Sequence, residues 1–378
     1  MKTGIITFHR SINYGSALQA WALSRVLSDM GEDPEIIDYE PNNYREMYSL
    51  FYPPVKKKYL STDLLHTVLA PYFIRRDRDF RRFRKECLPL GKDRYRAGSD
   101  ISAFTKTKDV MICGSDQIWN PAARDFDVTF LLGEVHDVRK VSYAVSVGKS
   151  TFDGVKDRDY IRSCLQDFSY LSMREKTGAE AVGALLGEEA AVHVDPDPTL
   201  LIEKEEFRKL AAKRVVKEPY IFFYSVRLNR SALGAALAFS EKTGLPVYTH
   251  VSREGTMDLV RRRKELRLAP GDAGPRGFVR MLADAEYVIT DSFHGTALSV
   301  IFEKEFYAVN DRLRDGSPRN DARITNLLEA LGLEQRHVPA GNLKEADTEK
   351  RIDYAPVTEK RREMAAVSAA GLKAAIRE

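Results

Sequence analysis

A short polar cluster late in the chain holds side chains suited to acid–base chemistry. Residues 291–296 read DSFHGT and follow a short apolar run. His294 can carry or release a proton near neutral pH, and Asp291 could orient its ring or cap a following helix. Because a lone histidine in a turn is more often structural, the cluster predicts either a catalytic acid or an ordinary turn.

A second candidate is the arginine in SMRE, residues 172–175. The planar guanidinium of Arg174 presents paired N–H groups that fit a carboxylate or a phosphate. The alternative is a salt bridge with Glu175 or another acid. Asp195 and Asp197 resemble a metal-binding pair, but no histidine stands at ligand spacing, so we expect no metal site.

Two more polar clusters lie in the first third of the chain, HRSINYG at 9–15 and GSDQ at 114–117. Asp116 and Gln117 could bind sugar hydroxyls or cap the next turn. Helices that begin after such clusters have free N–H groups that can hold an anion. The substrate-binding residues predicted from the three clusters are His9, Asn13, Tyr14, Gly15, Gly114, Ser115, Asp116, Gln117, Asp291, Ser292, Gly295 and Thr296.

The elements that carry these clusters alternate between strand and helix. Residues 4–8 and 34–40 are short apolar runs, and between them Ala20, Leu23, Leu27 and Met30 recur at helical spacing. Strand, helix and strand within forty residues form a βαβ unit with parallel strands. Further strands are predicted at 110–113, 141–147 and 168–173, and a second alternating series starts at 220–226 and includes 287–290. The fold class is therefore α/β, with two Rossmann-like lobes.

The predicted domains are an N-terminal lobe at 1–200, a linker at 201–218, a C-terminal lobe at 219–355 and a helix at 356–378. All three polar clusters follow predicted strands, and ligands bind at the carboxyl ends of parallel strands. We therefore expect residues 9–15 and 114–117 on one wall of a cleft between the lobes and residues 291–296 on the other. No G-x-G-x-x-G or P-loop motif is present, which argues against NAD and against ordinary ATP hydrolysis.

Composition predicts a cytoplasmic protein. The N-terminus lacks the apolar run of a secretory signal, no segment is apolar enough to cross a bilayer, and the three cysteines form no CxxC pair. A net charge of +4 is too small to indicate nucleic-acid binding. A basic stretch runs from Lys56 to Lys85, with Tyr72, Phe80 and Phe83 at helical spacing. It predicts either a solvated helix face or a peripheral docking surface for anionic lipid at the inner face of the membrane.

Five segments together resemble the polysaccharide pyruvyl transferase family. They are GIITFHRSINYGSALQAWAL (4–23), CGSDQIWNP (113–121), LSMREKTGAE (171–180), GFVRMLADAEYVITDSFHGTALSVIFEKEF (277–306) and RNDARITNLLEALGL (319–333). The resemblance runs in order through residues 4–335, and the fourth segment is the most specific.

The resemblance implies an architecture like that of GT-B glycosyltransferases, with a C-terminal helix that crosses back to the first lobe. It also implies transfer of pyruvate from phosphoenolpyruvate to two hydroxyls of a cell-surface glycan or lipid-linked oligosaccharide, giving a ketal and phosphate without metal or organic cofactor. His294 matches the family's proton donor, and Arg174 matches its other functional arginine. The family's Arg-Leu-His triplet is here Ser292-Phe293-His294, so the arginine that helps hold the donor is absent from that position.

Two other functions remain open on the same fold. One is a nucleotide-sugar-dependent glycosyltransferase, although no acidic pair is clearly placed for a ribose. The other is a non-catalytic glycan-binding relative, which the serine at position 292 favours.

Overall fold

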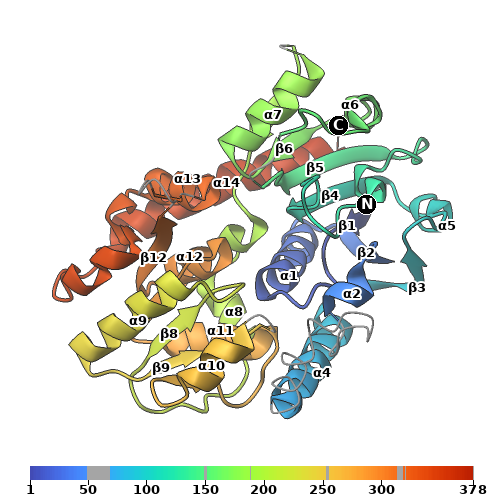
Figure 1. Ribbon diagram of the computed structural model, residues 1–378. Helices are drawn as coiled ribbons and strands as arrows, with labels where there is room; N and C mark the ends of the chain where they lie inside the picture. The colour runs from blue at the N-terminus through green and yellow to red at the C-terminus, as the bar shows by residue number, and fades with distance from the viewer. Residues whose placement is uncertain are drawn as a thin grey trace.

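A computed structural model describes residues 1–48, 69–148, 151–187, 189–252, 255–312, 318–319 and 321–377. The lysines at 56–58 of the basic stretch lie outside these ranges. Figure 1 shows two α/β lobes, the first to the right and the second to the left.

The first lobe is built on a seven-stranded parallel sheet. Its spatial order is β3-β2-β1-β4-β5-β6-β7, which places the first strand next to the centre. The strands are β1 (Lys2–Ile6), β2 (Asp33–Glu40), β3 (Leu90–Arg96), β4 (Val110–Asp116), β5 (Arg139–Val145), β6 (Leu171–Met173) and β7 (Val192–Val194). The helices of this lobe are α1 (Tyr14–Asp29), α2 (Tyr44–Tyr48), α4 (Ala70–Cys87), α5 (Ser102–Thr105), η2 (Val128–Leu131), α6 (Arg158–Gln166) and α7 (Lys176–Leu186).

The second lobe repeats this plan with the order β10-β9-β8-β11-β12-β13, and β14 also pairs with β12. All pairs are parallel except β12 with β13. The strands are β8 (Ile221–Tyr224), β9 (Val247–Thr249), β10 (Leu266–Leu268), β11 (Tyr287–Thr290), β12 (Glu305–Arg312), β13 (Pro318–Arg319) and β14 (His337–Pro339). The helices are α9 (Arg230–Thr243), α10 (Thr256–Arg261), α11 (Pro275–Asp284), α12 (Phe293–Ile301), α13 (Ala322–Leu331), η5 (Glu334–Arg336) and η6 (Ala340–Glu345). The predicted fold class, two Rossmann-like α/β lobes, is confirmed.

Helix α1 lies between the lobes. Asn13 caps its first turn, since the side-chain oxygen accepts hydrogen bonds from the N–H groups of Gly15 (2.9 Å) and Ser16 (3.4 Å). The helix packs against β2 and β4 of the first lobe and against α11 and α12 of the second. This shared position explains why it is buried on nearly every side.

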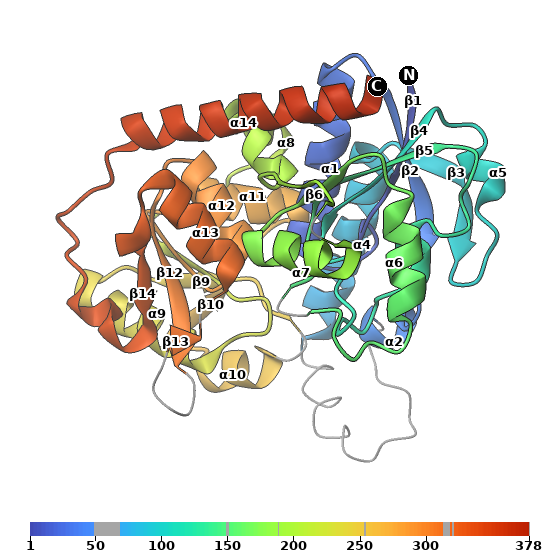
Figure 2. The ribbon, with the colours of Figure 1, turned by 90° about the horizontal axis from the view of Figure 1, so that it is seen from above.

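The segment between the sheets and the end of the chain tie the lobes together. The predicted linker contains the helix α8 (Lys204–Leu210) and is preceded by η3 (Pro198–Leu201). Helix α14 (Tyr354–Arg377) crosses from the second lobe to the first, as Figure 2 shows. There Arg139 donates to the backbone oxygen of Ile376 at 3.1 Å, and Ser368 lies 2.7 Å from the Tyr143 hydroxyl. One apolar core runs through both lobes and α14. Because this core does not separate the lobes, it does not test the predicted domain boundaries, which remain predictions.

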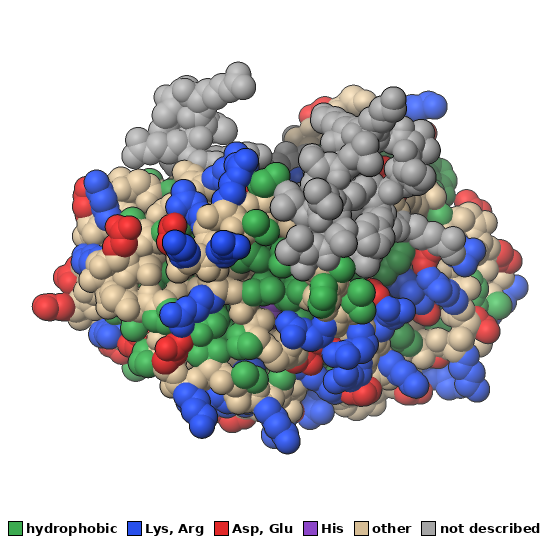
Figure 3. All heavy atoms as spheres, turned by 60° about the horizontal axis from the view of Figure 1, so that its bottom comes forward, with side chains coloured by type: hydrophobic (Ala, Val, Ile, Leu, Met, Phe, Trp, Pro, Cys, Tyr) green, Lys and Arg blue, Asp and Glu red, His purple; other side chains and the backbone are tan. Residues whose placement is uncertain are grey.

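The basic helix α4 also joins the lobes. The buried guanidinium of Arg76 donates to the backbone oxygens of Ile12 (3.0 Å) in one lobe and Val251 (3.1 Å) in the other. The carboxylate of Asp79 accepts from the N–H of Ala273 at 3.0 Å. Figure 3 shows Lys and Arg side chains gathered on the face formed by the bottom of Figure 1, next to hydrophobic patches. Whether lipid docks there remains a prediction. Among the described residues, none of the helices combines the length and apolar character needed to cross a bilayer.

Candidate functional site

His294 lies in the first turn of α12, where the chain leaves β11. Ser292 caps this helix, because its hydroxyl accepts from the N–H of Gly295 at 3.4 Å. The imidazole packs on Gly15 at the start of α1, and a Cβ atom placed on Gly15 would lie only 2.1 Å from His294 Nδ1. The two predicted walls therefore meet at these residues, and only a glycine leaves room for the ring.

Asp197 connects this histidine to Arg174. Its Oδ2 accepts a hydrogen bond from Arg174 Nη1 at 2.6 Å and lies 3.4 Å from His294 Nε2. Its Oδ1 accepts from the N–H (3.0 Å) and the hydroxyl (2.8 Å) of Thr199. The Asp197 side chain is completely buried. Burial acts to raise the pKa of this carboxyl, but His294, Arg174 and the hydrogen bonds outweigh it and hold the pKa well below its usual value.

Asp116 is the second carboxylate of the site. Its Oδ1 lies 3.5 Å from Arg174 Nη2, and its Oδ2 accepts from the Ser16 hydroxyl at 2.5 Å. Burial alone would raise its pKa, but the charges of Arg174 and His294 lower it. Two carboxylates thus face one guanidinium and one imidazole.

Arg174 keeps hydrogen-bond donors to spare. Among the described residues, its buried Nε and Nη2 lack a hydrogen-bond partner, although Nη2 lies 3.5 Å from Asp116 Oδ1. The guanidinium lies 4.8 Å from the centre of the Phe293 ring. The ion pairs of Arg174 are with Asp197 and Asp116, not with Glu175, and they are buried rather than exposed. Unsatisfied buried donors are costly, so this fork is well suited to an incoming anion.

A second group of charges borders the site. Glu175 is fully buried, and one of its carboxylate oxygens accepts from the Ser146 hydroxyl at 2.7 Å. The other oxygen has no hydrogen-bond partner in the described part of the chain. Arg323, in the first turn of α13, donates from Nε to Asp321 Oδ1 at 2.8 Å. The side-chain amide of Gln117, turned so that its oxygen faces the guanidinium, accepts from Arg323 Nη2 at 3.0 Å. Gln117 and Arg323 therefore form another contact between the lobes.

Asp291 is placed differently from either sequence-based interpretation. It neither orients His294 nor caps α12, since Asp197 and Ser292 take these positions. Its carboxylate instead accepts from the Ser225 hydroxyl at 3.0 Å. Burial raises the pKa of Asp291 to about 6, and the negative charge of Asp321 adds to this effect.

Several predicted residues have supporting places. His9 is bonded to Asp38 (3.0 Å), and the Tyr14 hydroxyl donates to the backbone oxygen of Ala273 (2.9 Å), with its ring stacked on Phe278. The remaining predicted residues hold the turns. In the first lobe, Asn13 caps α1, Gly114 has a φ of 132°, and the Ser115 hydroxyl donates to Ala144 (2.7 Å) and Asp197 (3.2 Å). In the second lobe, a Cβ on Gly295 would lie 2.3 Å from Thr290 Oγ1, and the Thr296 hydroxyl donates to Ser292 (3.1 Å).

Sequence reasoning missed Asp197, Glu175 and Arg323 as members of this group. In the sequence Asp197 stands out only as one of a possible pair of metal ligands, and within the described ranges no three His, Cys, Asp or Glu side chains are grouped so that they could hold a metal ion. The one available signal was position, because Glu175 follows Arg174 directly. Asp197 and His294 are almost a hundred positions apart in the sequence, and no local sequence pattern predicts a contact over that separation.

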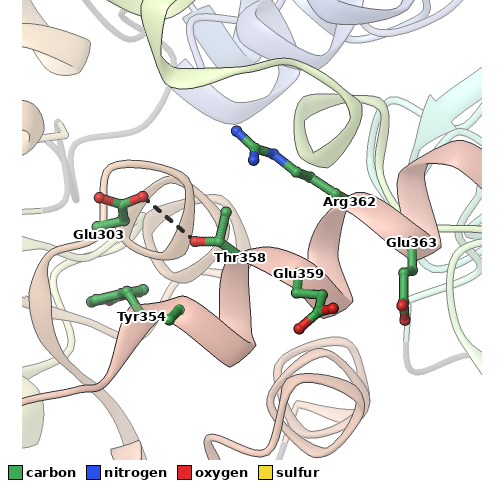
Figure 4. Close-up of a pocket in the computed structure, with 7 residues that line it drawn as sticks. Glu303, Tyr354, Thr358, Glu359, Arg362 and Glu363 are labelled. Atoms are coloured by element: carbon green, nitrogen blue, oxygen red, sulfur yellow. Dashed lines mark hydrogen bonds between the residues drawn. The ribbon is translucent and has the colours of Figure 1, made fainter.

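An open groove of about 650 Å³ lies elsewhere, along α14 (Figure 4). Three glutamates and one arginine supply its charges, and Arg362 already pairs with Glu203. None of the predicted site residues lines it. The lining residues are Glu303, Tyr354, Ala355, Thr358, Glu359, Arg362 and Glu363.

Several solved structures share this fold. The S. aureus MnaA–UDP structure matches with a TM-score of 0.52 and 10% identity over 96% of this chain and 90% of that one. UDP-GlcNAc 2-epimerase from Methanocaldococcus jannaschii matches with a TM-score of 0.51 and 14% identity over 97% and 99% of the two chains. Trehalose-6-phosphate synthase OtsA matches with a TM-score of 0.53 and 12% identity over 100% and 99%. At these identities the likeness shows the fold alone, which is that of GT-B glycosyltransferases and UDP-GlcNAc 2-epimerases.

Comparison at the level of sequence identifies the family. No curated protein sequence matches the chain significantly. The sequence profile of the family described as polysaccharide pyruvyl transferase matches residues 13–311, which includes α1, Arg174, Asp197 and His294. The chain belongs to the polysaccharide pyruvyl transferase family.

Proposed function

We propose that this protein transfers pyruvate from phosphoenolpyruvate to two hydroxyls of a glycan, forming a ketal and releasing phosphate. The observation that carries the proposal is the buried group in which Arg174 and His294 share one oxygen of Asp197. It supplies an acid and an anion-binding fork on opposite lobes, and both are needed for this reaction.

His294 is the proposed proton donor to C3 of phosphoenolpyruvate. Protonation of C3 leaves C2 electron-poor, so that a sugar hydroxyl can attack it. Arg174 is the proposed grip on the donor's carboxylate or phosphate. Asp197 is a positioning residue, because it holds both groups.

The donor carries more negative charge than one arginine can balance. Ser292 cannot supply a second cation because its side chain is neutral, and its hydroxyl caps α12. Arg323 is the proposed second cation, because it reaches the same cleft from the second lobe and contacts Gln117 of the first. With Arg323 as the second cation, the serine at position 292 no longer favours a non-catalytic relative.

The proposed acceptor is a polysaccharide repeat or a lipid-linked oligosaccharide. Phosphoenolpyruvate is a cytoplasmic metabolite, so the proposal keeps the reaction in the cytoplasm. Lipid docking on the exposed arginines of α4, such as Arg78 and Arg81, would bring a lipid-linked acceptor to the enzyme.

The test is phosphate release from phosphoenolpyruvate in the presence of a panel of glycan acceptors, with mass spectrometry of the product for the added pyruvyl group. His294→Gln should lower turnover about 10²- to 10⁴-fold, because an amide can form hydrogen bonds but cannot protonate carbon. Near-normal turnover of this variant would refute the acid role. Failure of the wild type with every acceptor would refute the donor, and sugar transfer from a nucleotide sugar would then be the function to test.

A further inference from the structure

Most carboxylates at the cleft are paired with a cation. Asp116 and Asp197 pair with Arg174, and Asp321 pairs with Arg323. Among the described residues, Glu175 and Asp291 are the site carboxylates without an ion pair. Glu175 is fully buried, whereas Asp291 is partly exposed, so only Asp291 is open to an incoming substrate.

Asp291 has polar but uncharged partners. Ser225, just after β8, donates its hydroxyl to Oδ2 at 3.0 Å, and the nearby side chain of Asn229 acts to lower the pKa of the carboxyl. The charge of another acid, Asp321, acts to raise it. These partners fix the orientation of the carboxylate and leave its charge uncompensated.

The position of Asp291 relates it to both walls of the site. It follows β11 directly and stands three residues before His294. Its hydrogen-bond partner Ser225 directly follows Tyr224, whose ring centre lies 5.7 Å from that of Tyr14 in the first lobe. These contacts place Asp291 near the junction of the lobes.

We propose that Asp291 is the base that removes the proton from the acceptor hydroxyl as this hydroxyl attacks C2 of the donor. The inference rests on the proposed function and adds a catalytic residue to it. The raised pKa of about 6 supports it, since such a carboxylate is mostly ionised at pH 7 yet is a stronger base than an ordinary aspartate.

The protons and electrons balance over the whole transfer. His294 gives a proton to C3, which becomes a methyl carbon, and the first acceptor oxygen bonds to C2 while its proton passes to Asp291. The bond from C2 to the phosphate oxygen then breaks, and the phosphate leaves with the electron pair and takes the proton from Asp291. The second hydroxyl bonds to C2, and its proton returns to His294.

The test compares wild type with Asp291→Asn and Asp291→Ala, using phosphoenolpyruvate and an acceptor that the wild type modifies. The asparagine still accepts from Ser225 but cannot take a proton. We expect its kcat to fall about 10²- to 10³-fold, with little change in the affinity for phosphoenolpyruvate measured by titration calorimetry. The wild-type kcat should fall below about pH 6, and this fall should be absent in Asp291→Asn. The kcat is measured at saturating substrate, so that titration of unbound phosphoenolpyruvate does not affect it.

Chemical rescue separates a base from a structural residue. Added formate should restore part of the turnover of Asp291→Ala, because a small carboxylate can occupy the space and accept the proton. The matched control is Asp272→Asn, which removes another buried carboxyl of raised pKa that hydrogen-bonds backbone N–H groups of Gly274 and Gly277. It should keep the wild-type pH profile.

The outcomes distinguish this inference from the proposed function. A wild type that never consumes phosphoenolpyruvate refutes the proposed function and the base together. If the wild type is active, either of two results refutes the base alone. In the first, Asp291→Asn keeps the wild-type rate. In the second, Asp291→Asn loses rate but keeps the fall below pH 6, and formate does not rescue Asp291→Ala.

Discussion

At the scale of single residues, the shared oxygen of Asp197 is the feature on which the site depends. A buried carboxylate between an arginine and a histidine sets the orientation of both groups. The same residue therefore links stability to catalysis, and the two effects can be measured separately.

Replacing Asp197 with asparagine should weaken the fold and the reaction together. The change leaves the buried Arg174 with only the more distant Asp116, and loss of one partner of a buried pair typically costs about 3–5 kcal/mol. We expect a lower free energy of unfolding in urea and a kcat reduced at least about 100-fold.

Asp195→Asn is the control for that change, because Asp195 lies in the same loop but binds only the hydroxyls of Tyr170, Ser172 and Ser368. Its kcat should stay within a few-fold of wild type. A large loss in this control would mean that the loop as a whole, rather than the charge of Asp197, supports the site.

Asp291 carries a cost in stability that depends on pH. Its pKa is about 6 in the folded protein and about 3.9 in the unfolded chain, so the folded state holds more protons between these values. Stability therefore falls as pH rises from about 4 to about 6 and stays lower above that range.

The variant Asp291→Asn removes this titration. At pH 7 it should be more stable than the wild type by up to about 3 kcal/mol, the equivalent of about two pKa units, and the gain should vanish near pH 3.5. Urea unfolding at the two pH values measures the difference. An equal effect at both values would mean that the carboxyl titrates normally.

At the scale of elements, the first turns of α1 and α12 meet in the closest contact of the site. Gly15→Ala should lower activity, because its Cβ would overlap the imidazole of His294 and push it from Asp197. Helix propensity alone predicts that Gly15→Ala makes the protein more stable, because alanine is a better helix former than glycine by about 1 kcal/mol.

The matched control is Gly234→Ala in α9, where a new Cβ meets no atom within 4 Å. It should raise the melting temperature slightly and leave kcat unchanged. If Gly15→Ala behaves like this control, the contact between Gly15 and His294 does not exist in solution.

The sequence predicted most elements because their apolar runs are uninterrupted. Strands at 110–113 and 287–290 correspond to β4 and β11, and the helical spacing after Gly15 corresponds to α1. The edge strand β3 was missed, since its sequence LGKDRYR is mostly polar and exposed. Edge strands need little apolar character, so periodicity does not reveal them.

The site was only partly predictable for a different reason. Residues at strand ends, such as Asp116 and His294, could be selected because the sheet rule places them together. Tyr14 was selected by the same rule but turns into the packing between the lobes. Asp197 was missed because the short strand that it follows, β7, is mostly exposed and was itself not predicted.

At the scale of the whole molecule, the two lobes behave as one packed body. A continuous apolar core, the helix α4 and the crossing helix α14 all join them. Separate folding of either half would expose much of this core, so the lobes depend on each other for stability.

The contact between Gly15 and His294 also bears on access in the proposed reaction. The His294 side chain is 9% exposed and packs against the opposite wall, so in this proposal the donor reaches it only after the walls separate locally. Entry and release are then kinetic events separate from the chemistry, and the slowest step limits turnover. In the same proposal, closure after entry keeps out water, which would otherwise hydrolyse the activated enol.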